Sequence, residues 1–367
     1  MTDEKYMRLA LDMAQKGCGY VNPNPMVGAV IVKEGRIIGQ GWHEKYGQPH
    51  AERNALETCS ESPEEATMYV TLEPCCHFGK TPPCTDAILN SGIKKVVIGS
   101  RDPNPLVSGN GITALKKNGV KVVTGVLEAE CNRLNEVFFH YIQMGTPFVV
   151  MKYAMTMDGK IATAAGNSKW ITGDPARDNV HKDRHKYSAI MVGVGTVIAD
   201  NPMLTCRLEN CRQPVRIICD TNMRIPVASN LVTTADISET IIATSCEDLK
   251  RHKPYMEAGC EILTVPKKNN RLDLNILMQQ LGKRKIDSIL LEGGSELNFS
   301  ALQNKIVNKI HAYISPKIFG GDKAKTPVGG IGLEEVQNCF KLNAPKATWF
   351  GEDLLIESEV IYPCLQE

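Results

Sequence analysis

No run of about 18 apolar residues occurs in the sequence, so no membrane-spanning helix is expected. The first residues, Met1–Lys5, include acidic side chains and begin no long apolar segment, so we expect no signal peptide. Basic residues are not gathered either: the formal net charge is +1, and the longest Lys/Arg run is Lys283–Lys285. A nucleic-acid-binding surface is therefore not expected. Internal repeats and low-complexity segments are also missing.

Cysteine, in contrast, is plentiful. The 13 cysteines form an odd number and are scattered from Cys18 to Cys364. Disulfide frameworks belong to short secreted chains, and this chain is neither short nor typical of secretion. We therefore expect mostly reduced thiols in a cytoplasmic protein. Only Cys75 and Cys84 have a spacing that suggests a metal site.

Length and pattern predict two domains. Apolar residues make up 43% of the 367 residues, enough for ordinary hydrophobic cores. Short β-rich segments alternate with amphipathic helical segments in both halves, which predicts α/β domains with mixed or largely parallel sheets. Residues 128–142 are expected to form one helix that ends before Gly145-Thr146-Pro147, where Gly and Pro interrupt regular structure. We predict domains at residues 1–146 and 147–367.

A metal motif lies in the first half. His50-Ala51-Glu52 is followed by Pro74-Cys75 and, after an inserted loop, by Cys84. One His and two Cys supply three ligands to zinc and leave a position for water, as in catalytic sites. Zinc-dependent base deaminases use this H-x-E and P-C arrangement, with the Glu moving protons. We predict that His50, Cys75 and Cys84 bind Zn²⁺ and that Glu52 is catalytic.

Other interpretations of these residues remain. Taken singly, His50 fits a surface histidine and each cysteine fits a core residue. Cys76 and His77 could also reach a metal, and Cys75 is preferred because it follows Pro74. Zinc could also stabilise the fold without catalysis, or the motif could serve a nucleic-acid-editing deaminase, against which the near-neutral charge argues.

The segments around the motif carry a family resemblance. They are residues 22–30, 50–52, 71–84, 102–105 and 109–111. Together they resemble the deaminase domain of the bifunctional riboflavin biosynthesis (RibD) family. The loop between Cys76 and Cys84 separates this family from cytidine and tRNA-adenosine deaminases. The resemblance implies a cytidine-deaminase-like three-layer α/β/α domain that deaminates 2,5-diamino-6-(5-phosphoribosylamino)pyrimidin-4-one.

Polar loop residues near the motif are candidate contacts for this small-molecule substrate. They are Asn24, His43, Lys80, Asp102 and Asn104. Among them, Lys80 is the best cation for the ribose phosphate. Each of these residues also fits a solvated loop, so the pattern leaves both interpretations open.

Glycine-rich turns in the second half give a weaker signal. Gly193–Ile198 follows a predicted strand but lacks the third glycine of a dinucleotide-binding G-x-G-x-x-G motif. Gly293-Gly294 lies between a predicted strand and a predicted helix over 295–304, where backbone N–H groups can bind a phosphate. A plain strand-to-helix turn is the alternative.

Several segments of the second half resemble the reductase domain of the same family. They are residues 152–162, 168–172, 193–196, 200–207 and 291–294. The resemblance implies a dihydrofolate-reductase-like α/β fold, NADPH as the reductant of the ribosyl group, and a homo-oligomer, dimer or tetramer. Cofactor positions carried over from the family are Ala154, Trp170, Thr196, Asp200, Thr221, Gly294, Ser295 and Glu296. Substrate positions are Ser168, Arg184, Leu204, Arg207 and Glu292.

The chemistry of these residues suits the implied reaction. Arg184 and Arg207 could grip a phosphate with paired N–H groups, and Trp170 offers a flat face to a ring. Arg207 could instead form a surface ion pair, and Trp170 could be a core aromatic. Lys152 and Asp200 are candidates for moving a proton at the sugar ring oxygen, although Lys152 could simply pair with an acid.

Overall fold

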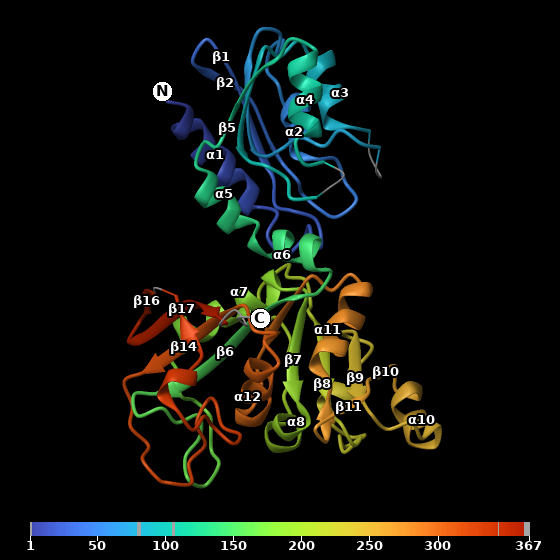
Figure 1. Cartoon of the computed structure of the whole chain (residues 1–367), viewed down its shortest axis with the longest axis vertical. Helices are drawn as coiled ribbons and strands as arrows, with labels where there is room; N and C mark the ends of the chain where they lie inside the picture. Colours follow the sequence, from blue (N-terminus) through green and yellow to red (C-terminus); the bar gives the residue numbers. More distant parts are fainter. Residues whose placement is uncertain (1, 79–81, 105–106, 344, 363–367) are drawn as a thin grey trace. The chain divides into compact units, whose positions relative to one another are not determined.

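The computed structural model describes residues 2–78, 82–104, 107–343 and 345–362. The chain divides into two compact units, Met1–Gly145 and Thr146–Glu367 (Figure 1). The division falls within the Gly-Thr-Pro segment at which the sequence pattern changes. None of the helices in the described ranges combines the length and the apolar character needed to span a bilayer.

The first unit is built on a mixed sheet. Its strands are β1 (Gly28–Lys33), β2 (Arg36–Trp42), β3 (Thr67–Leu72), β4 (Lys95–Ser100) and β5 (Lys121–Thr124), in the order β2-β1-β3-β4-β5. β1 runs antiparallel to both of its neighbours, β2 and β3. Its pairing with β2 follows from the tight turn at Glu34-Gly35, which returns the chain directly into β2. β3, β4 and β5 are parallel, and helices make the crossovers between them.

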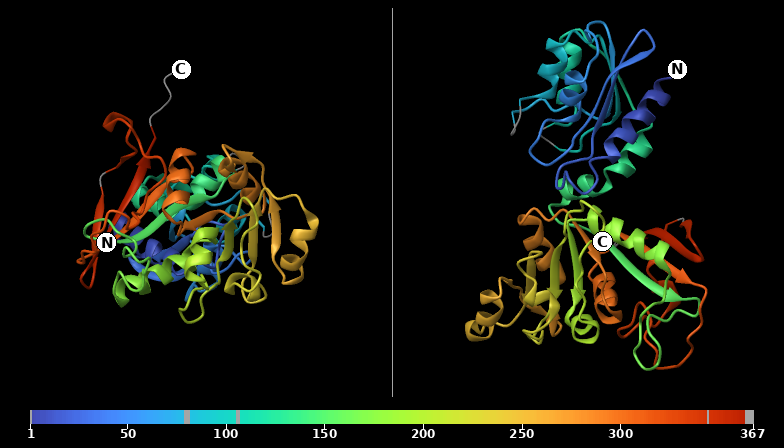
Figure 2. Two further views of the ribbon diagram at one scale, coloured as in Figure 1. Left: turned by 90° about the horizontal axis from the view of Figure 1, so that it is seen from below. Right: turned by 180° about the vertical axis from the view of Figure 1, so that it is seen from behind.

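Helices cover both faces of this sheet, which gives the predicted three layers. The helices are α1 (Asp3–Gln15), α2 (Ala51–Glu57), α3 (Cys84–Asn90), α4 (Asn110–Lys117), α5 (Glu128–Leu134) and α6 (Glu136–Met144). α1 and α5 pack on one face, where they bury Val30 and Val97. α2, α3 and α4 pack on the other face, over Ile31 and Val70 (Figures 1 and 2). Alternate strand residues therefore enter two separate cores.

The segment expected to be one helix over 128–142 is two helices, so that prediction is wrong. α5 ends at Leu134 and α6 begins at Glu136, with buried Asn135 between them. The Asn135 side chain accepts a hydrogen bond from the Met26 N–H (2.8 Å) and donates one to the Met26 carbonyl (3.0 Å). This tie to a distant loop turns the chain and directs α6 away from α5.

The second unit is built on a long, mainly parallel sheet. Its strands are β6 (Phe148–Thr156), β7 (Ala189–Gly193), β8 (Val215–Cys219), β9 (Thr240–Thr244), β10 (Glu261–Thr264), β13 (Ser288–Leu291), β14 (Lys309–Ser315), β15 (Lys341–Leu342), β16 (Lys346–Phe350) and β17 (Asp353–Ile361). The order is β10-β9-β8-β7-β13-β6-β14-β17, and β15 and β16 both pair with β17. The strands from β10 to β14 are parallel, and β17 runs antiparallel to β14. β13 thus lies between β6 and β7, although it follows both in sequence.

Helices flank this sheet on both sides. They are α7 (Asp174–Lys186), α8 (Val194–Asp200), α9 (Asn230–Thr233), α10 (Leu249–Glu257), α11 (Leu274–Lys283) and α12 (Ser295–Gln303); a short 3-10 turn (Val336–Asn338) and a small hairpin, β11 (Lys267–Lys268) and β12 (Arg271–Leu272), complete the unit. α11 and α12 cover one face, over Met151 and Leu291. α8 and α9 cover the other face, over Ile190 and Ile218. Seven short elements of this unit were not expected from the sequence: α8, α9, α10, β11, β12, β15 and β16.

Candidate active sites

Three metal-binding side chains meet in the first unit. His50 precedes α2 as its N-cap residue, Cys84 is the first residue of α3, and Cys75 follows β3. The His50 Nδ1 atom lies 3.5 Å from the Cys75 Sγ atom and 3.4 Å from the Cys84 Sγ atom. All three ligand atoms lie within 4.8 Å of one another. Within the described ranges, Cys76 and His77 belong to no such group.

This donor set fits zinc. Zn²⁺ prefers thiolate and imidazole ligands, and three protein ligands leave its fourth position open. The backbone N–H of Cys84 also donates to the Cys75 sulfur (3.4 Å). Hydrogen bonds from the Cys84 thiol, the His50 ring and this N–H lower the pKa of Cys75 to about 4. Cys75 is therefore prepared as a thiolate ligand before any ion arrives.

Glu52 is the second residue of α2 and lies beside the ligand group without belonging to it. Its side chain is buried. Burial raises its pKa above the usual range, and the nearby charge of Cys75 adds to that effect. A carboxyl whose pKa is raised toward neutrality can both accept and return a proton, which is what a general acid–base requires.

A cavity of about 330 Å³ opens beside these groups. His50, Glu52 and Cys75 line it together with four of the predicted substrate residues, which are Asn24, His43, Asp102 and Asn104. The Asn24 Nδ2 atom lies 3.2 Å from the His43 Nε2 atom, and the His43 Nδ1 atom lies 3.1 Å from the Pro49 carbonyl. Lys80 lies outside the described residues.

Asp102 is held firmly at the wall of this cavity. Its carboxylate accepts a hydrogen bond from the Asn104 N–H (2.8 Å). Burial raises the pKa of Asp102 to about 6, so its carboxyl can be protonated near neutrality. A group that both donates and accepts hydrogen bonds suits the mixed pattern of a pyrimidine edge.

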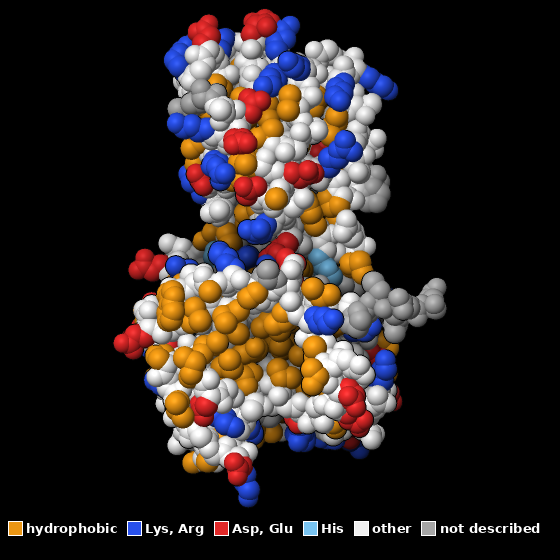
Figure 3. Space-filling view, turned by 60° about the vertical axis from the view of Figure 1, so that its left-hand side comes forward, with side chains coloured by type: hydrophobic (Ala, Val, Ile, Leu, Met, Phe, Trp, Pro, Cys, Tyr) orange, Lys and Arg blue, Asp and Glu red, His pale blue; other side chains and the backbone are white. Residues whose placement is uncertain are grey.

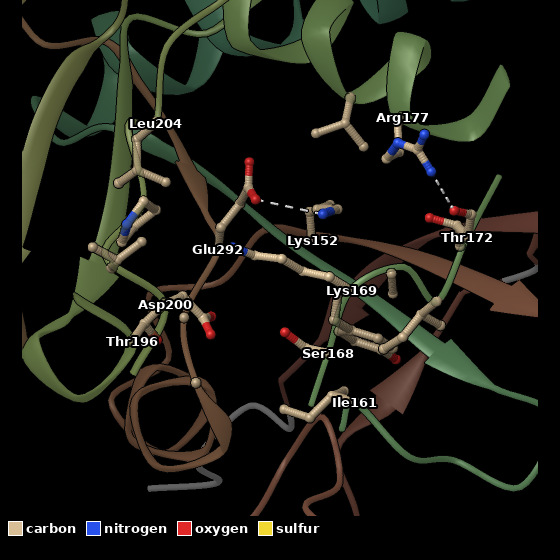
Figure 4. A pocket seen from close by; sticks show the side chains of 18 of the residues that line it. Lys152, Ile161, Ser168, Lys169, Thr172, Arg177, Thr196, Asp200, Leu204 and Glu292 are labelled. Carbon is tan, nitrogen blue, oxygen red and sulfur yellow. Dashed lines mark hydrogen bonds and ion pairs between the residues drawn. The ribbon is translucent and has the colours of Figure 1, made fainter. Parts of the chain in front are cut away.

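A second cavity, of about 620 Å³, lies in the other unit (Figure 4). Ten of the thirteen residues predicted for that half line it: Ala154, Ser168, Trp170, Arg184, Thr196, Asp200, Leu204, Arg207, Glu292 and Gly294. They come from the carboxyl ends of β6, β7 and β13 and from the loops around them. In parallel sheets, ligands bind at this edge.

Three predicted cofactor residues are not part of the lining. The Thr221 carbonyl accepts hydrogen bonds from the Ser245 N–H (3.1 Å) and the Thr244 hydroxyl (3.4 Å) beyond the end of β8. The Ser295 hydroxyl donates to the Thr326 carbonyl. Glu296 forms an exposed ion pair with Arg271 (2.6 Å).

Glu292 is the centre of a charged cluster in this cavity. It forms two hydrogen bonds with the Arg184 guanidinium, at 2.9 and 3.2 Å. It also forms an ion pair with the Lys152 amine at 3.4 Å, which Figure 4 shows as a dashed line. Arg184 also donates to the Thr205 carbonyl (3.1 Å). Although burial alone would raise it, these two cations lower the pKa of Glu292 to about 2. The carboxylate is therefore ionised, and most of the Arg184 donors are already used.

Trp170 is an exposed platform and not a core aromatic. Its side chain is 60% exposed, and the Arg177 guanidinium lies 4.6 Å from its ring centre. The Lys317 amine fixes the backbone by donating to the carbonyls of Trp170 (2.9 Å) and Ile171 (2.7 Å). One face of the ring remains available for stacking.

Comparison with known proteins decides the family. The RibD C-terminal domain matches residues 147–356, and the cytidine and deoxycytidylate deaminase zinc-binding region matches residues 1–100. The riboflavin biosynthesis protein RibD of Actinobacillus pleuropneumoniae is 55% identical over 99% of this chain and 96% of its own length. The chain belongs to the RibD family.

Solved structures of this family agree over the whole chain. The diaminohydroxyphosphoribosylaminopyrimidine deaminase/5-amino-6-(5-phosphoribosylamino)uracil reductase of Thermotoga maritima is 41% identical, with a TM-score of 0.87, and covers 98% of this chain and 99% of its own. Acinetobacter baumannii RibD is 34% identical with a TM-score of 0.88 and the same coverage. As a RibD protein, the chain is a bifunctional deaminase and reductase of riboflavin biosynthesis, with zinc and NADPH as cofactors. The predicted cytidine-deaminase-like and dihydrofolate-reductase-like folds are confirmed.

The sequence analysis missed several residues on the two cavity walls. Phe138, Tyr141 and Ile142 of α6 line the first cavity, and Lys169, Arg177 and His181 line the second. The α6 residues could have been found only by recognising the break at Asn135. Arg177 and His181 share a helix with Arg184 at spacings that put them on nearby faces, so the helical period was an available signal.

Proposed function

We propose that the cavity of the first unit hydrolyses the 2-amino group of 2,5-diamino-6-(5-phosphoribosylamino)pyrimidin-4-one. The cavity of the second unit then reduces the ribosyl group of the product to ribityl. The observation that carries the first assignment is a buried Glu52 beside three zinc-type ligands, in a cavity with polar walls.

In the deaminase site, His50, Cys75 and Cys84 would hold the zinc ion, and Zn²⁺ bound there lowers the pKa of a water molecule from 15.7 toward about 7. Glu52 accepts a proton from the attacking water and returns it to the ring nitrogen and the departing amine, so that ammonia leaves. Burial raises the pKa of its carboxyl, which favours its role in returning the proton.

In this site, the polar residues that line the cavity bind the substrate. Asn24, His43, Asp102 and Asn104 face the pyrimidine, and Lys80 binds the ribose phosphate. Phe138 and Tyr141 give the same cavity an aromatic side against which the flat ring can pack.

In the reductase site, bound NADPH supplies a hydride to C1′ of the sugar. Ala154, Trp170, Thr196, Asp200 and Gly294 form the cofactor side of the cavity, and Thr221, Ser295 and Glu296 contribute from beyond its lining. Ser168, Arg184, Leu204, Arg207 and Glu292 form the substrate side. Lys152 and Asp200 line the same cavity and are the two candidates for delivering a proton to the sugar ring oxygen as the ring opens.

Replacing Glu52 by Gln tests the deaminase assignment. Because Glu52 lies outside the ligand group, the variant should retain one zinc ion per chain and lose deamination by about 10²-fold or more. Reduction of the deaminated substrate by the same variant serves as the internal control and should be unchanged. Retained deamination would contradict the role of Glu52, and lost zinc would contradict its exclusion from the ligands.

We propose further that the protein is a cytoplasmic homo-oligomer, a dimer or a tetramer. An apolar surface of the second unit supports association, and Figure 3 shows apolar side chains gathered there. On β16 and β17, Trp349 pairs with Leu354 and Ala347 pairs with Ile356, so these side chains share one face. Trp349 is 68% exposed. Such a patch is unusual on a monomer.

A further inference from the structure

His181 is a side chain of the reductase cavity that the proposed mechanism leaves unused. It lies on α7, one turn before Arg184, and lines the cavity together with Arg184 and Arg207. Its Nδ1 atom is buried and has no hydrogen-bond partner among the described residues. Buried polar atoms without partners are rare in native proteins and call for an explanation.

The loop that carries Arg207 is fastened to the same helix. The Cys206 thiol donates a hydrogen bond to the His181 carbonyl (3.3 Å), and the Thr205 carbonyl accepts one from Arg184 (3.1 Å). These bonds hold Arg207 against the turn of α7 that contains His181. Within the described chain, neither the Arg207 guanidinium nor the His181 ring forms an ion pair or a hydrogen bond that would occupy it.

The charges around His181 determine its protonation state. Burial lowers the pKa of His181, and the positive charges of Arg184 and Arg207 lower it further, against the smaller opposing effects of Glu292 and Asp178. The ring is therefore neutral at pH 7. Leaving a buried acceptor without a hydrogen bond costs less free energy than leaving a buried N–H donor without one. The neutral ring therefore carries its proton on Nε2, and the buried Nδ1 atom is the unprotonated acceptor.

We propose that His181 is a further substrate-binding residue, whose Nε2–H group donates a hydrogen bond to the phosphate of the reductase substrate beside Arg207. This inference rests on the proposed function, since it requires that Arg207 binds that phosphate. Most N–H groups of Arg184 already donate hydrogen bonds to Glu292 and Thr205. Arg207 alone would then leave some phosphate oxygens without a hydrogen-bond donor. His181 supplies one directed donor without adding a charge.

The test is the KM of purified full-length protein for two substrates, followed as NADPH oxidation. One substrate is 5-amino-6-(5-phosphoribosylamino)uracil, and the other is the same compound without its phosphate. His181→Leu should raise the KM for the phosphorylated substrate about 10-fold, as expected for one hydrogen bond to a charged group, with kcat within about twofold. The KM for the dephosphorylated compound should not change. His181→Gln keeps an N–H donor and should recover most of the loss.

Two controls separate the possible failures. Lys182→Leu changes an exposed neighbour on α7 and should leave both KM values unchanged. The affinity of each variant for NADPH shows whether the second unit remains folded. Three results would each overturn the role of His181. They are equal KM increases for both substrates, a fall in kcat at constant KM, and unchanged KM and kcat values. Arg207→Ala tests the underlying phosphate site: if it leaves the phosphorylated substrate unaffected, the proposed site itself is wrong.

Discussion

Neutralising Glu292 should destabilise the second unit, because this carboxylate holds two cations in a largely closed cavity. Its side chain is 14% exposed, and those of Lys152 and Arg184 are 14% and 15% exposed. Glu292→Gln keeps the shape of the side chain and removes its charge. Lys152 and Arg184 are then left buried without a counter-ion, and removing one partner of a buried pair is among the most costly changes a protein can suffer.

The size of the effect follows from the pKa of Glu292. A carboxyl whose pKa falls from 4.5 to about 2 on folding contributes roughly 3 kcal/mol at neutral pH, since each pKa unit corresponds to about 1.4 kcal/mol. The second unit comprises residues 146–367. For a domain of that size, 3 kcal/mol corresponds to a decrease in Tm of about 6–12 °C.

Differential scanning calorimetry of wild type and variant measures this decrease. The matched control is Glu296→Gln, which breaks an exposed Glu–Arg pair four residues away and should cost less than about 1 kcal/mol. Because the folded pKa of Glu292 is lowered, its stabilising effect is complete above about pH 5 and is lost as the pH falls from 4.5 toward 2. The difference in Tm between wild type and Glu292→Gln should therefore decrease as the pH is lowered. Equal Tm decreases for both variants, or a gap that stays constant between pH 5 and pH 3, would refute the reasoning.

Three further predictions concern other parts of the molecule. Removing zinc with a strong chelator should stop deamination while the same sample still oxidises NADPH with the deaminated substrate; loss of both activities would mean that the zinc group supports more than its own site. Asn135→Ala should lower the unfolding free energy of the first unit by about 1–3 kcal/mol in urea denaturation, because the Met26 N–H and carbonyl lose their partners, and an unchanged midpoint would contradict this. Trp349→Lys should shift the oligomer toward smaller species in light scattering at constant protein concentration; an unchanged mass would place the contact elsewhere.

The zinc site could be predicted because its ligands lie in short sequence motifs. His50 and Glu52 lie two residues apart, Cys75 follows a proline, and few other functions need that combination. Two of the ligands lie at helix starts: His50 is the N-cap of α2, and Cys84 is the first residue of α3. The substrate residues of the reductase site were predicted only through resemblance to a family, and those of the deaminase site only as polar loop residues near the motif, since a single Asn or Asp in a loop has no pattern of its own.

What the sequence could not show depends on contacts between distant residues. The break between α5 and α6 is made by Asn135 and Met26, which lie 109 positions apart. The aromatic wall from α6 was missed for the same reason. Lys152 was left undecided between catalysis and pairing with an acid, and its partner Glu292 is 140 residues away.

The position of β13 between β6 and β7 has a consequence for the newly made chain. All the zinc ligands are present once residue 84 has been synthesised, and the first unit is complete at residue 145. β6 leaves the ribosome soon afterwards, yet its two neighbours, β13 and β14, begin only at residues 288 and 309. At about 5–20 residues per second, this apolar strand waits roughly 7 to 26 seconds for its first partner. The deaminase half can therefore mature while β6 of the reductase half still has no partner strand.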